Sequence, residues 1–285
     1  MSPKSYQYVN RQRYRLMPEG TIDVRLSEDV VISEEPLNIV LHWSCHQTHQ
    51  VLEKNLMVTM RTPGQDALLV TGLLLSYAII QNRSQINKIE TEEHNQCDVF
   101  LSDDVALDWK SLTRQFVSHS GCGICGANDV KKLAHSFDMS IDETAHWLPL
   151  QYVLTLSSQL RKQQTLFSAT GGVHSAGVFT LTQCLSVHED VGRHNAVDKV
   201  IGDLVNQGLL SKQNILMLSG RVSFELMQKA VAANIAVVVA IGAPSSLAVA
   251  VAKQFNITLI GFVSEHTCNV YHGDFRLIKS KHSNR

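Results

Sequence analysis

The sequence lacks a long apolar run, and it lacks an excess of either charge. No stretch approaches the roughly 20 consecutive apolar residues of a membrane helix, and the N-terminal MSPKSYQYVNRQRYRLMPEG has no apolar segment of the signal-peptide kind. With 25 basic and 26 acidic residues the formal net charge is −1, so no global positive field favours nucleic acid or an anionic membrane. We therefore expect a cytoplasmic protein with neither partner, in which any anion site is local.

Cysteine is also scarce. Only 6 of the 285 residues are cysteines, and they stand in unrelated contexts: Cys45, Cys97, Cys122, Cys125, Cys184 and Cys268. This distribution differs from a secreted disulfide framework and fits a reducing compartment. Cys97 and Cys184 lie in apolar stretches and are expected to be small core residues. Only Cys122 and Cys125, within SHSGCGICGAND, form a motif.

The first half of the chain has the pattern of a small β-rich subdomain. Residues 1–20 are polar and expected to be disordered, and residues 279–285 form a polar tail. EEPLNIVLHW and NLMVTMRT predict a hairpin with an enlarged loop, PGQDALLVTGLLLSYAII predicts a helix, and INKIETEE and CDVFLS predict two further strands. We expect this N-terminal subdomain to cover residues 21–139 and to end in the C-x-x-C loop.

Residues 140–278 show a regular alternation instead. SIDE at 140–143 has the spacing of a helix capping box, and a helix is expected from Leu150 to Arg161. Beyond residue 172, apolar strand-like runs alternate with helices such as RHNAVDKVIGDLV, whose apolar residues share one face. Strands that are apolar throughout are expected where helices cover both faces of a sheet. The prediction is a largely parallel sheet in a three-layer α/β domain that binds a ligand.

Small polar and basic residues follow these strands. Ser219 and Arg221 come after one strand, IGAPSS comes after the next, and Arg193 opens a helix in EDVGRHN. Ligands gather at the carboxyl ends of parallel strands, and helix N-termini bind phosphate. His174 stands beside two glycines that permit close approach of a ligand, although a lone histidine is more often structural. The pattern favours a nucleotide or pyrophosphate ligand, while ordinary helix capping remains the alternative for the serines.

The C-x-x-C pair suits three chemistries: dithiol exchange, half of a zinc site, and sulfur relay through a persulfide. A C-x-x-C turn lowers a cysteine pKa towards neutrality, and the thiolate is the reactive form. The three glycines around Cys122 and Cys125 leave the loop open to a bulky donor or acceptor.

Zinc and thioredoxin-like chemistry fit less well. A second C-x-x-C is absent, although His42, Cys45, His46 and His49 could supply further ligands. The H-x-E and P-C-x-x-C motifs of zinc deaminases are also absent. A thioredoxin-type pair follows the first strand of a βαβ unit, whereas this pair lies between two differently patterned halves. No zinc is expected.

Eight segments occur in the order found in a known family: EEPL, VTMRTPG, SGCGICG, TGGVHSAG, EDVGRHNAVDKVIG, SGRVSFELMQKA, APSSLAVAVA and TLIGF. From about residue 34 to 262 the chain resembles the formate dehydrogenase accessory sulfurtransferases of the FdhD type. The resemblance implies a cytidine deaminase-like α/β fold and a homodimer. It also implies a cytoplasmic sulfurtransferase that takes sulfur from a cysteine desulfurase and passes it to the molybdenum cofactor, Mo-bis(molybdopterin guanine dinucleotide), of the formate dehydrogenase catalytic subunit.

The resemblance also implies site residues. Cys122 matches the persulfide-bearing cysteine and Cys125 its partner. The stretch that matches the cofactor-binding segment is Phe262, Val263, Ser264, Glu265, His266 and Thr267. Relatives often carry arginines there and this chain has none, so the anion-binding role is expected to pass to Arg193 or Arg221. His174 and Ser219 complete the expected cofactor site.

Two functions follow as hypotheses. In the first, the Cys122 thiolate accepts sulfur as a persulfide and delivers it to molybdenum, with Cys125 assisting release. In the second, the protein is a chaperone that shields the molybdenum cofactor, and the cysteine pair is a redox sensor or a zinc clip. A thiol–disulfide oxidoreductase is a third and less favoured alternative.

Overall fold

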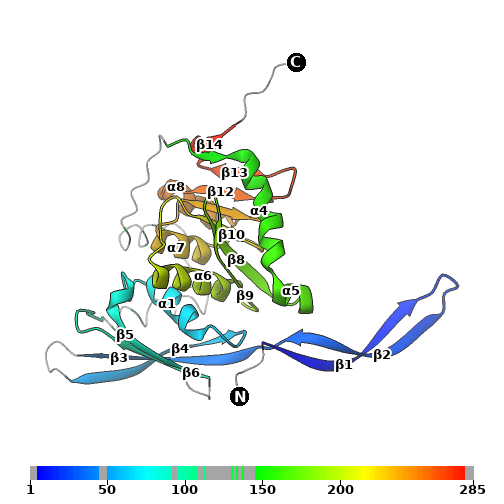
Figure 1. Ribbon diagram of the computed structural model, residues 1–285, viewed down its shortest axis with the longest axis horizontal. Coiled ribbons are helices and arrows are strands. Elements are labelled where there is room, and N and C mark those ends of the chain that lie inside the picture. Colours follow the sequence, from blue (N-terminus) through cyan, green and yellow to red (C-terminus); the bar gives the residue numbers. More distant parts are fainter. Residues whose placement is uncertain are drawn as a thin grey trace.

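The structure is a computed structural model, and it describes residues 5–44, 50–91, 95–107 and 145–279, together with Trp109, Leu112, Val130, Leu133 and Phe137. The chain is a mixed α/β protein with several sheets (Figure 1). Within these ranges, no helix is both long and apolar enough to cross a lipid bilayer.

The N-terminal half forms two sheets. A two-stranded sheet contains β1 (Tyr6–Leu16) and β2 (Ile22–Ile32). A four-stranded sheet has the order β4-β3-β6-β5, with β3 (Glu35–Ser44), β4 (Val51–Arg61), β5 (Ile86–Thr91) and β6 (Gln96–Leu101). The β3–β4 hairpin, α1 (Asp66–Ser76) and β5–β6 confirm the sequence predictions. The short 3-10 turn η1 (Arg83–Gln85) precedes β5.

The polar N-terminus was expected to be disordered, and this is wrong for residues 6–16. They form β1, which pairs with β2 over eleven positions from Tyr6–Ile32 to Leu16–Ile22. The reason is the period-2 alternation of tyrosines with polar residues. This pattern suits a strand even where the average composition is polar.

The C-terminal half is built around a six-stranded sheet of order β13-β12-β11-β10-β8-β9. Its strands are β8 (His174–Phe179), β9 (Cys184–Asp190), β10 (Ile215–Leu218), β11 (Val237–Ala240), β12 (Thr258–Gly261) and β13 (Asn269–His272). The helices are α4 (Leu150–Gln163), α5 (Thr165–Thr170), α6 (Arg193–Gln207), α7 (Phe224–Ala232) and α8 (Ser246–Gln254). A small parallel pair, β7 (Leu148–Pro149) with β14 (Leu277–Ile278), and the turn η2 (Asp274–Arg276) complete this half.

The expected largely parallel sheet is a mixed sheet. Only β10, β11 and β12 run parallel, whereas β8–β9, β8–β10 and β12–β13 pair antiparallel. A four-residue connection at 180–183 joins β8 to β9, and so short a link permits only antiparallel pairing. β9 was not predicted as a strand separate from the helix after it.

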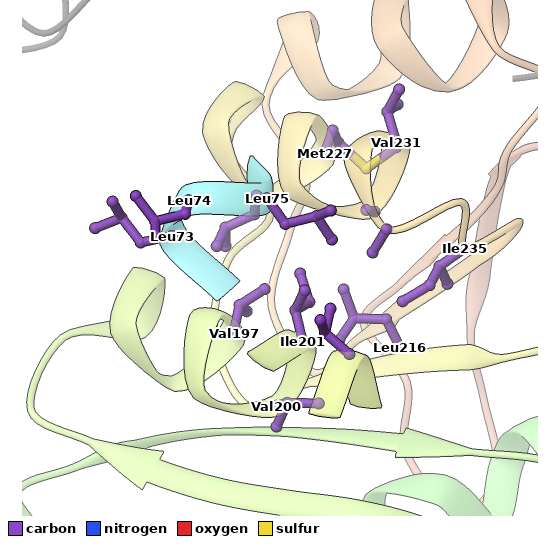
Figure 2. Close-up of a cluster of buried hydrophobic side chains, with 14 of the residues drawn as sticks. Leu73, Leu74, Leu75, Val197, Val200, Ile201, Leu216, Met227, Val231 and Ile235 are labelled. Atoms are coloured by element: carbon purple, nitrogen blue, oxygen red, sulfur yellow. The ribbon is translucent and has the colours of Figure 1, made fainter. Parts of the chain in front are cut away.

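The sheet is covered on both faces. Residues of one face, such as Leu216 and Val238, share a core with α1, α6, α7, α8 and the four-stranded sheet. Met217 and Val239 point the other way and pack against α4. Figure 2 shows side chains of α1, α6, α7 and β10 meeting in the larger core. This agrees with the expected three layers, although the large core also includes the N-terminal strands.

The remaining fold predictions have mixed outcomes. The proposed subdomain boundary at 139/140 and the capping box at 140–143 lie outside the described residues. Cys97 is fully buried, as expected of a core residue. Cys184 is exposed, contrary to expectation, because it begins an edge strand beside the turn at 180–183.

Candidate functional site

A pocket of about 830 Å³ opens at one edge of the six-stranded sheet. The carboxyl ends of β10 and β11 meet the amino end of β8 there, because β8 runs antiparallel to β10. The C-terminal end of α4 and the segment from α5 to β8 supply the other wall. The lining residues are Ser157, Ser158, Arg161, Lys162, Gln164, Phe167, Gly171, Gly172, Val173, His174, Val191, Ser219, Ile241 and Glu265.

Three residues predicted from the sequence come together in this pocket: His174, Ser219 and Glu265. The Ser219 hydroxyl accepts a hydrogen bond of 2.9 Å from the Ser175 amide, so it joins β10 to β8 and does not cap a helix. His174 packs close to Gly220, since a Cβ atom at position 220 would lie 3.3 Å from the His174 Nδ1 atom. The glycine therefore lets the backbone after β10 approach the imidazole.

His174 is held in its neutral form. Burial lowers its pKa, and the positive charges of Arg193 and Arg221 lower it further. The two predicted arginines thus act on the electrostatics of the pocket, although neither lines it. The Arg193 Nε atom is buried and has no hydrogen-bond partner among the described residues, which leaves a positively charged donor for an anionic ligand.

Two cations of the pocket were not predicted. Arg161 and Lys162 lie in the last turn of α4, and the Arg161 guanidinium stacks 4.2 Å from the centre of the Phe167 ring. The predicted anion-binding residues follow strands or begin helices, whereas these two residues come from a helix C-terminus. The adjacent basic pair in RKQQTLFSATGGVH was the available signal.

The predicted cofactor segment 262–267 contributes only Glu265 to the pocket lining. Phe262 is exposed and has a left-handed backbone with φ of 52°, which is unusual for a residue other than glycine. Val263 is buried. The Ser264 hydroxyl accepts hydrogen bonds from the amides of His266 and Thr267. The segment is therefore a tight turn after β12, with an acidic residue towards the pocket.

Most polar residues of EDVGRHNAVDK point into the protein. Asp190 is completely buried and accepts hydrogen bonds from the amides of Thr62 and Gly192, and the Lys199 Nζ atom lies 2.7 Å from its carboxylate. Asp198 forms a second buried ion pair with Lys229 at 2.7 Å. These contacts tie the start of α6 to α7 and to Thr62, the residue after β4, so the motif is largely structural.

A smaller cavity of about 330 Å³ lies on the other side of the start of α6. It is lined by Met57, Thr59, Met60, Leu73, Tyr77, Gly192, His194, Asn195, Asp198, Glu225 and Lys229. Burial, with the charges of Lys229 and Arg193, lowers the pKa of His194 to about 4. His194 therefore lines a cavity separate from the large pocket, whereas the adjacent Arg193 lines neither and acts on His174 and His194 through its charge.

The cysteines that the structure describes are poor nucleophiles. Burial raises the pKa of Cys97 to about 12, and partial burial of the thiol raises the pKa of Cys184 and of Cys268. All three thiols are therefore protonated at neutral pH, whereas the reactive form of a cysteine is the thiolate.

Ser245, one of the serines considered for ligand binding, caps α8 instead. Its hydroxyl accepts a hydrogen bond from the Ala248 amide.

The expected sulfur site, Cys122 and Cys125, lies outside the described residues, as do Cys45, His46 and His49. His42, the remaining member of the alternative zinc set, places its Nε2 atom 2.7 Å from Asp98 and stacks on Phe100. Within the part of the chain that the structure covers, no three His, Cys, Asp or Glu side chains cluster so as to hold a metal ion.

Known proteins resemble this chain over most of its length. It is 36% identical to the sulfur carrier protein FdhD of Streptomyces avermitilis, covering 94% of this chain and 95% of the relative. It is 37% identical to the protein of the same name from Sulfolobus acidocaldarius, covering 86% of this chain and 90% of the relative. A crystal structure from Desulfotalea psychrophila, of a candidate formate dehydrogenase accessory protein, has a TM-score of 0.70 at 22% identity, over 95% and 99% of the two chains, and so shares the fold. Because the profile of the FdhD/NarQ family also matches residues 32–278, the chain belongs to the FdhD/NarQ family.

Proposed function

We propose that this protein is a sulfur carrier and sulfurtransferase required for formate dehydrogenase maturation. Membership of the FdhD/NarQ family, and relatives named as sulfur carriers, support this function. The observation that carries it is the state of the cysteines. Cys97, Cys184 and Cys268 hold protonated thiols, whereas the glycine-rich motif with Cys122 and Cys125 has the pattern of reactive cysteines.

In the first step, a cysteine desulfurase presents a cysteine persulfide. The Cys122 thiolate attacks the outer sulfur, a new sulfur–sulfur bond forms on Cys122, and the desulfurase cysteine leaves as a thiolate. No net oxidation occurs, because the sulfane sulfur only changes carriers.

In the second step, the Cys125 thiolate attacks the inner sulfur of the Cys122 persulfide. The terminal sulfur leaves in its reduced form, as sulfide, for the molybdenum centre, and Cys122 and Cys125 become a disulfide. The two electrons gained by the transferred sulfur come from the two cysteines. A cellular dithiol then reduces the disulfide and restores the carrier.

The acceptor would be the molybdenum cofactor, Mo-bis(molybdopterin guanine dinucleotide), written here as a substrate. The pocket of about 830 Å³ lies within the range of small-molecule sites, about 300–1,000 Å³, so it suits one nucleotide arm of this large molecule. Arg161 and Lys162, which line the pocket, fit its phosphates. The negative charge of Glu265 would repel an anion, so the turn at residues 262–267 would contribute contacts other than charge attraction.

The experiment that tests the function is sulfur loading. The purified chain is incubated with a cysteine desulfurase and cysteine, and intact-mass and peptide mass spectrometry locate the added sulfur. We expect sulfur additions on the Cys122 peptide of the wild-type chain and none on Cys122→Ala. Cys184→Ala is the matched control, because it removes an exposed cysteine with a raised pKa and should load as the wild type does.

Persulfide at the wild-type level on the Cys122→Ala variant would reject the assignment of Cys122 as the residue that carries the sulfur. Bound zinc with no sulfur addition would instead favour the chaperone with a zinc clip. The cytoplasmic location and the identities of the donor and of the client dehydrogenase stay predictions.

A further inference from the structure

A buried carboxylate lies behind the wall of the large pocket. Glu189 belongs to β9 and is only 8% exposed, and β9 runs beside α5 at the edge of the sheet (Figure 1). One carboxylate oxygen of Glu189 accepts a hydrogen bond of 2.7 Å from the Leu166 amide, and the other accepts one of 2.8 Å from the Phe167 amide. The Thr165 hydroxyl donates to the same carboxylate at 3.4 Å. Both oxygens therefore bind the first turn of α5.

This carboxylate caps a helix that is too short to hold its own position. α5 has only six residues, and a helix of this length is not stable by itself. Its N-cap residue, Gln164, makes no side-chain cap hydrogen bond and donates instead to the Ser175 hydroxyl at 2.7 Å. The free N–H groups of a first turn and the helix dipole both favour a negative charge. The position of the first turn of α5 therefore depends on Glu189.

α5 in turn supports a cation of the pocket. The guanidinium carbon of Arg161 lies 4.2 Å from the centre of the Phe167 ring, and both residues line the pocket. An arginine side chain has many rotamers, and contact with an aromatic face restricts them. A guanidinium held in this way is preorganised for a phosphate group, because less freedom is lost on binding. One chain of contacts thus runs from Glu189 through Phe167 to Arg161.

We infer that Glu189 is a positioning residue of the large pocket, which acts through α5 to hold Arg161 in place for a phosphate group. The inference rests on the proposed function, in which the pocket takes a nucleotide arm. Glu189 does not line the pocket, so it acts through the wall. The sign of its effect separates positioning from charge. A negative charge near the pocket repels an anion, so charge alone predicts tighter binding when Glu189 is neutralised, whereas positioning predicts weaker binding.

Calorimetry of the full chain with guanosine diphosphate tests this inference. In Glu189→Gln the side-chain amide turns an N–H donor towards one of the two backbone donors, so the first turn of α5 loses a hydrogen bond. We expect the dissociation constant to rise about three- to fivefold, with the loss of the whole Arg161 contact as the upper limit. Asp203→Asn is the matched control, because Asp203 contacts β9 through the Ser186 hydroxyl at 2.7 Å but does not line the pocket. Its dissociation constant should stay within about twofold of the wild type.

A double-mutant cycle separates positioning from a general loss of structure. In the Arg161→Ala background, Glu189→Gln should change the dissociation constant by less than about 1.5-fold, because no guanidinium remains to be positioned. Phe167→Leu interrupts the same chain of contacts one step later. It should weaken binding to a similar extent by itself and have no further effect in the Arg161→Ala background. Should far-UV circular dichroism show that Glu189→Gln is unfolded, the cycle with Phe167→Leu decides the question.

Amide hydrogen exchange supplies a readout that needs no ligand. The amides of Leu166 and Phe167 should exchange faster in Glu189→Gln than in the wild type, and at the wild-type rate in Arg161→Ala. Unchanged exchange in Glu189→Gln would overturn the inference. Guanosine diphosphate binding by Glu189→Gln that is as tight as in the wild type, or tighter, would also overturn it, and so would effects of Glu189→Gln and Arg161→Ala that multiply.

The proposed function is tested separately from this inference. Sulfur loading of Cys122 needs no nucleotide, so it should proceed equally in the wild type and in Glu189→Gln. A wild-type chain that loads no sulfur would contradict the function. A wild-type chain that loads sulfur but does not bind guanosine diphosphate would leave the sulfur carrier intact and overturn the inference about Glu189.

Discussion

At the scale of single residues, two glycines decide how closely α1 and α6 approach. A Cβ atom on Gly72 would lie 1.9 Å from the Asp198 carbonyl oxygen, and one on Gly202 would lie 1.9 Å from the Leu68 carbonyl oxygen. The two helices therefore touch at their backbones. This contact positions the start of α6, on which both Arg193 and the two buried ion pairs depend.

Gly202→Ala should consequently destabilise the protein. The added methyl group cannot be accommodated without moving a backbone, and overpacking of this kind costs about 1–3 kcal/mol or more, which exceeds the gain of about 1 kcal/mol in helix propensity. We expect urea denaturation to show a loss of about 2 kcal/mol in the free energy of unfolding. Asn206→Ala, an exposed site in the same helix, should change it by less than about 0.5 kcal/mol. Equal effects of the two substitutions would refute the close-contact explanation.

At the scale of elements, α4 supplies the positive charge of the large pocket. Its last turn carries Arg161 and Lys162, and α5 follows at once with Phe167, on which Arg161 stacks. The six-stranded sheet supplies the opposite wall with His174 and Ser219. The proposed anion site is therefore assembled from a helix end and a sheet edge that are separate in sequence.

Arg161→Ala should weaken binding of an anionic nucleotide, with guanosine diphosphate as the probe. A partly exposed ionic contact contributes about 1 kcal/mol, so calorimetry should show a dissociation constant roughly fivefold higher. Lys253→Ala removes a cation from α8, on the other face of the sheet, and should bind as the wild type does. If both variants lose affinity equally, the probe binds through general charge and the assignment to this pocket fails.

At the scale of the whole molecule, one core joins both halves. The four-stranded sheet, α1, α6, α7 and one face of the six-stranded sheet share it. His194 lies in the cavity at this junction, where β4, α1, α6 and α7 meet. Its protonation therefore affects the stability of the entire fold.

Acid should destabilise the protein partly through His194. Its pKa is about 4 in the folded state and about 6.5 in an unfolded chain, so the unfolded state binds more protons between these values. The contribution is present above pH 6.5 and is lost as the pH falls towards 4. We expect the melting temperature of His194→Gln to fall less steeply over this interval than that of the wild type. Parallel curves for the two proteins would contradict the lowered pKa.

Local patterns accounted for much of the architecture. The apolar runs predicted β10, β11 and β12, and the shared apolar face of Ala196, Val197 and Val200 predicted α6. The meeting of His174 and Ser219 at one edge was not predicted, because it requires β8 to run antiparallel to β10. That direction depends on the short connection after β8, and the β1–β2 hairpin depends on an alternation within a polar composition.

The sequence alone determined most of the strands and helices, the family, and the position of the C-x-x-C motif, because each of these depends on spacing between near neighbours. Only the tertiary structure decided which charges are buried and which line the large pocket. It turned Asp190, Asp198 and Lys199 inward as buried partners, and it brought Arg161 from α4 to the sheet edge. Burial and long-range contact set these roles, and neither is a property of adjacent residues.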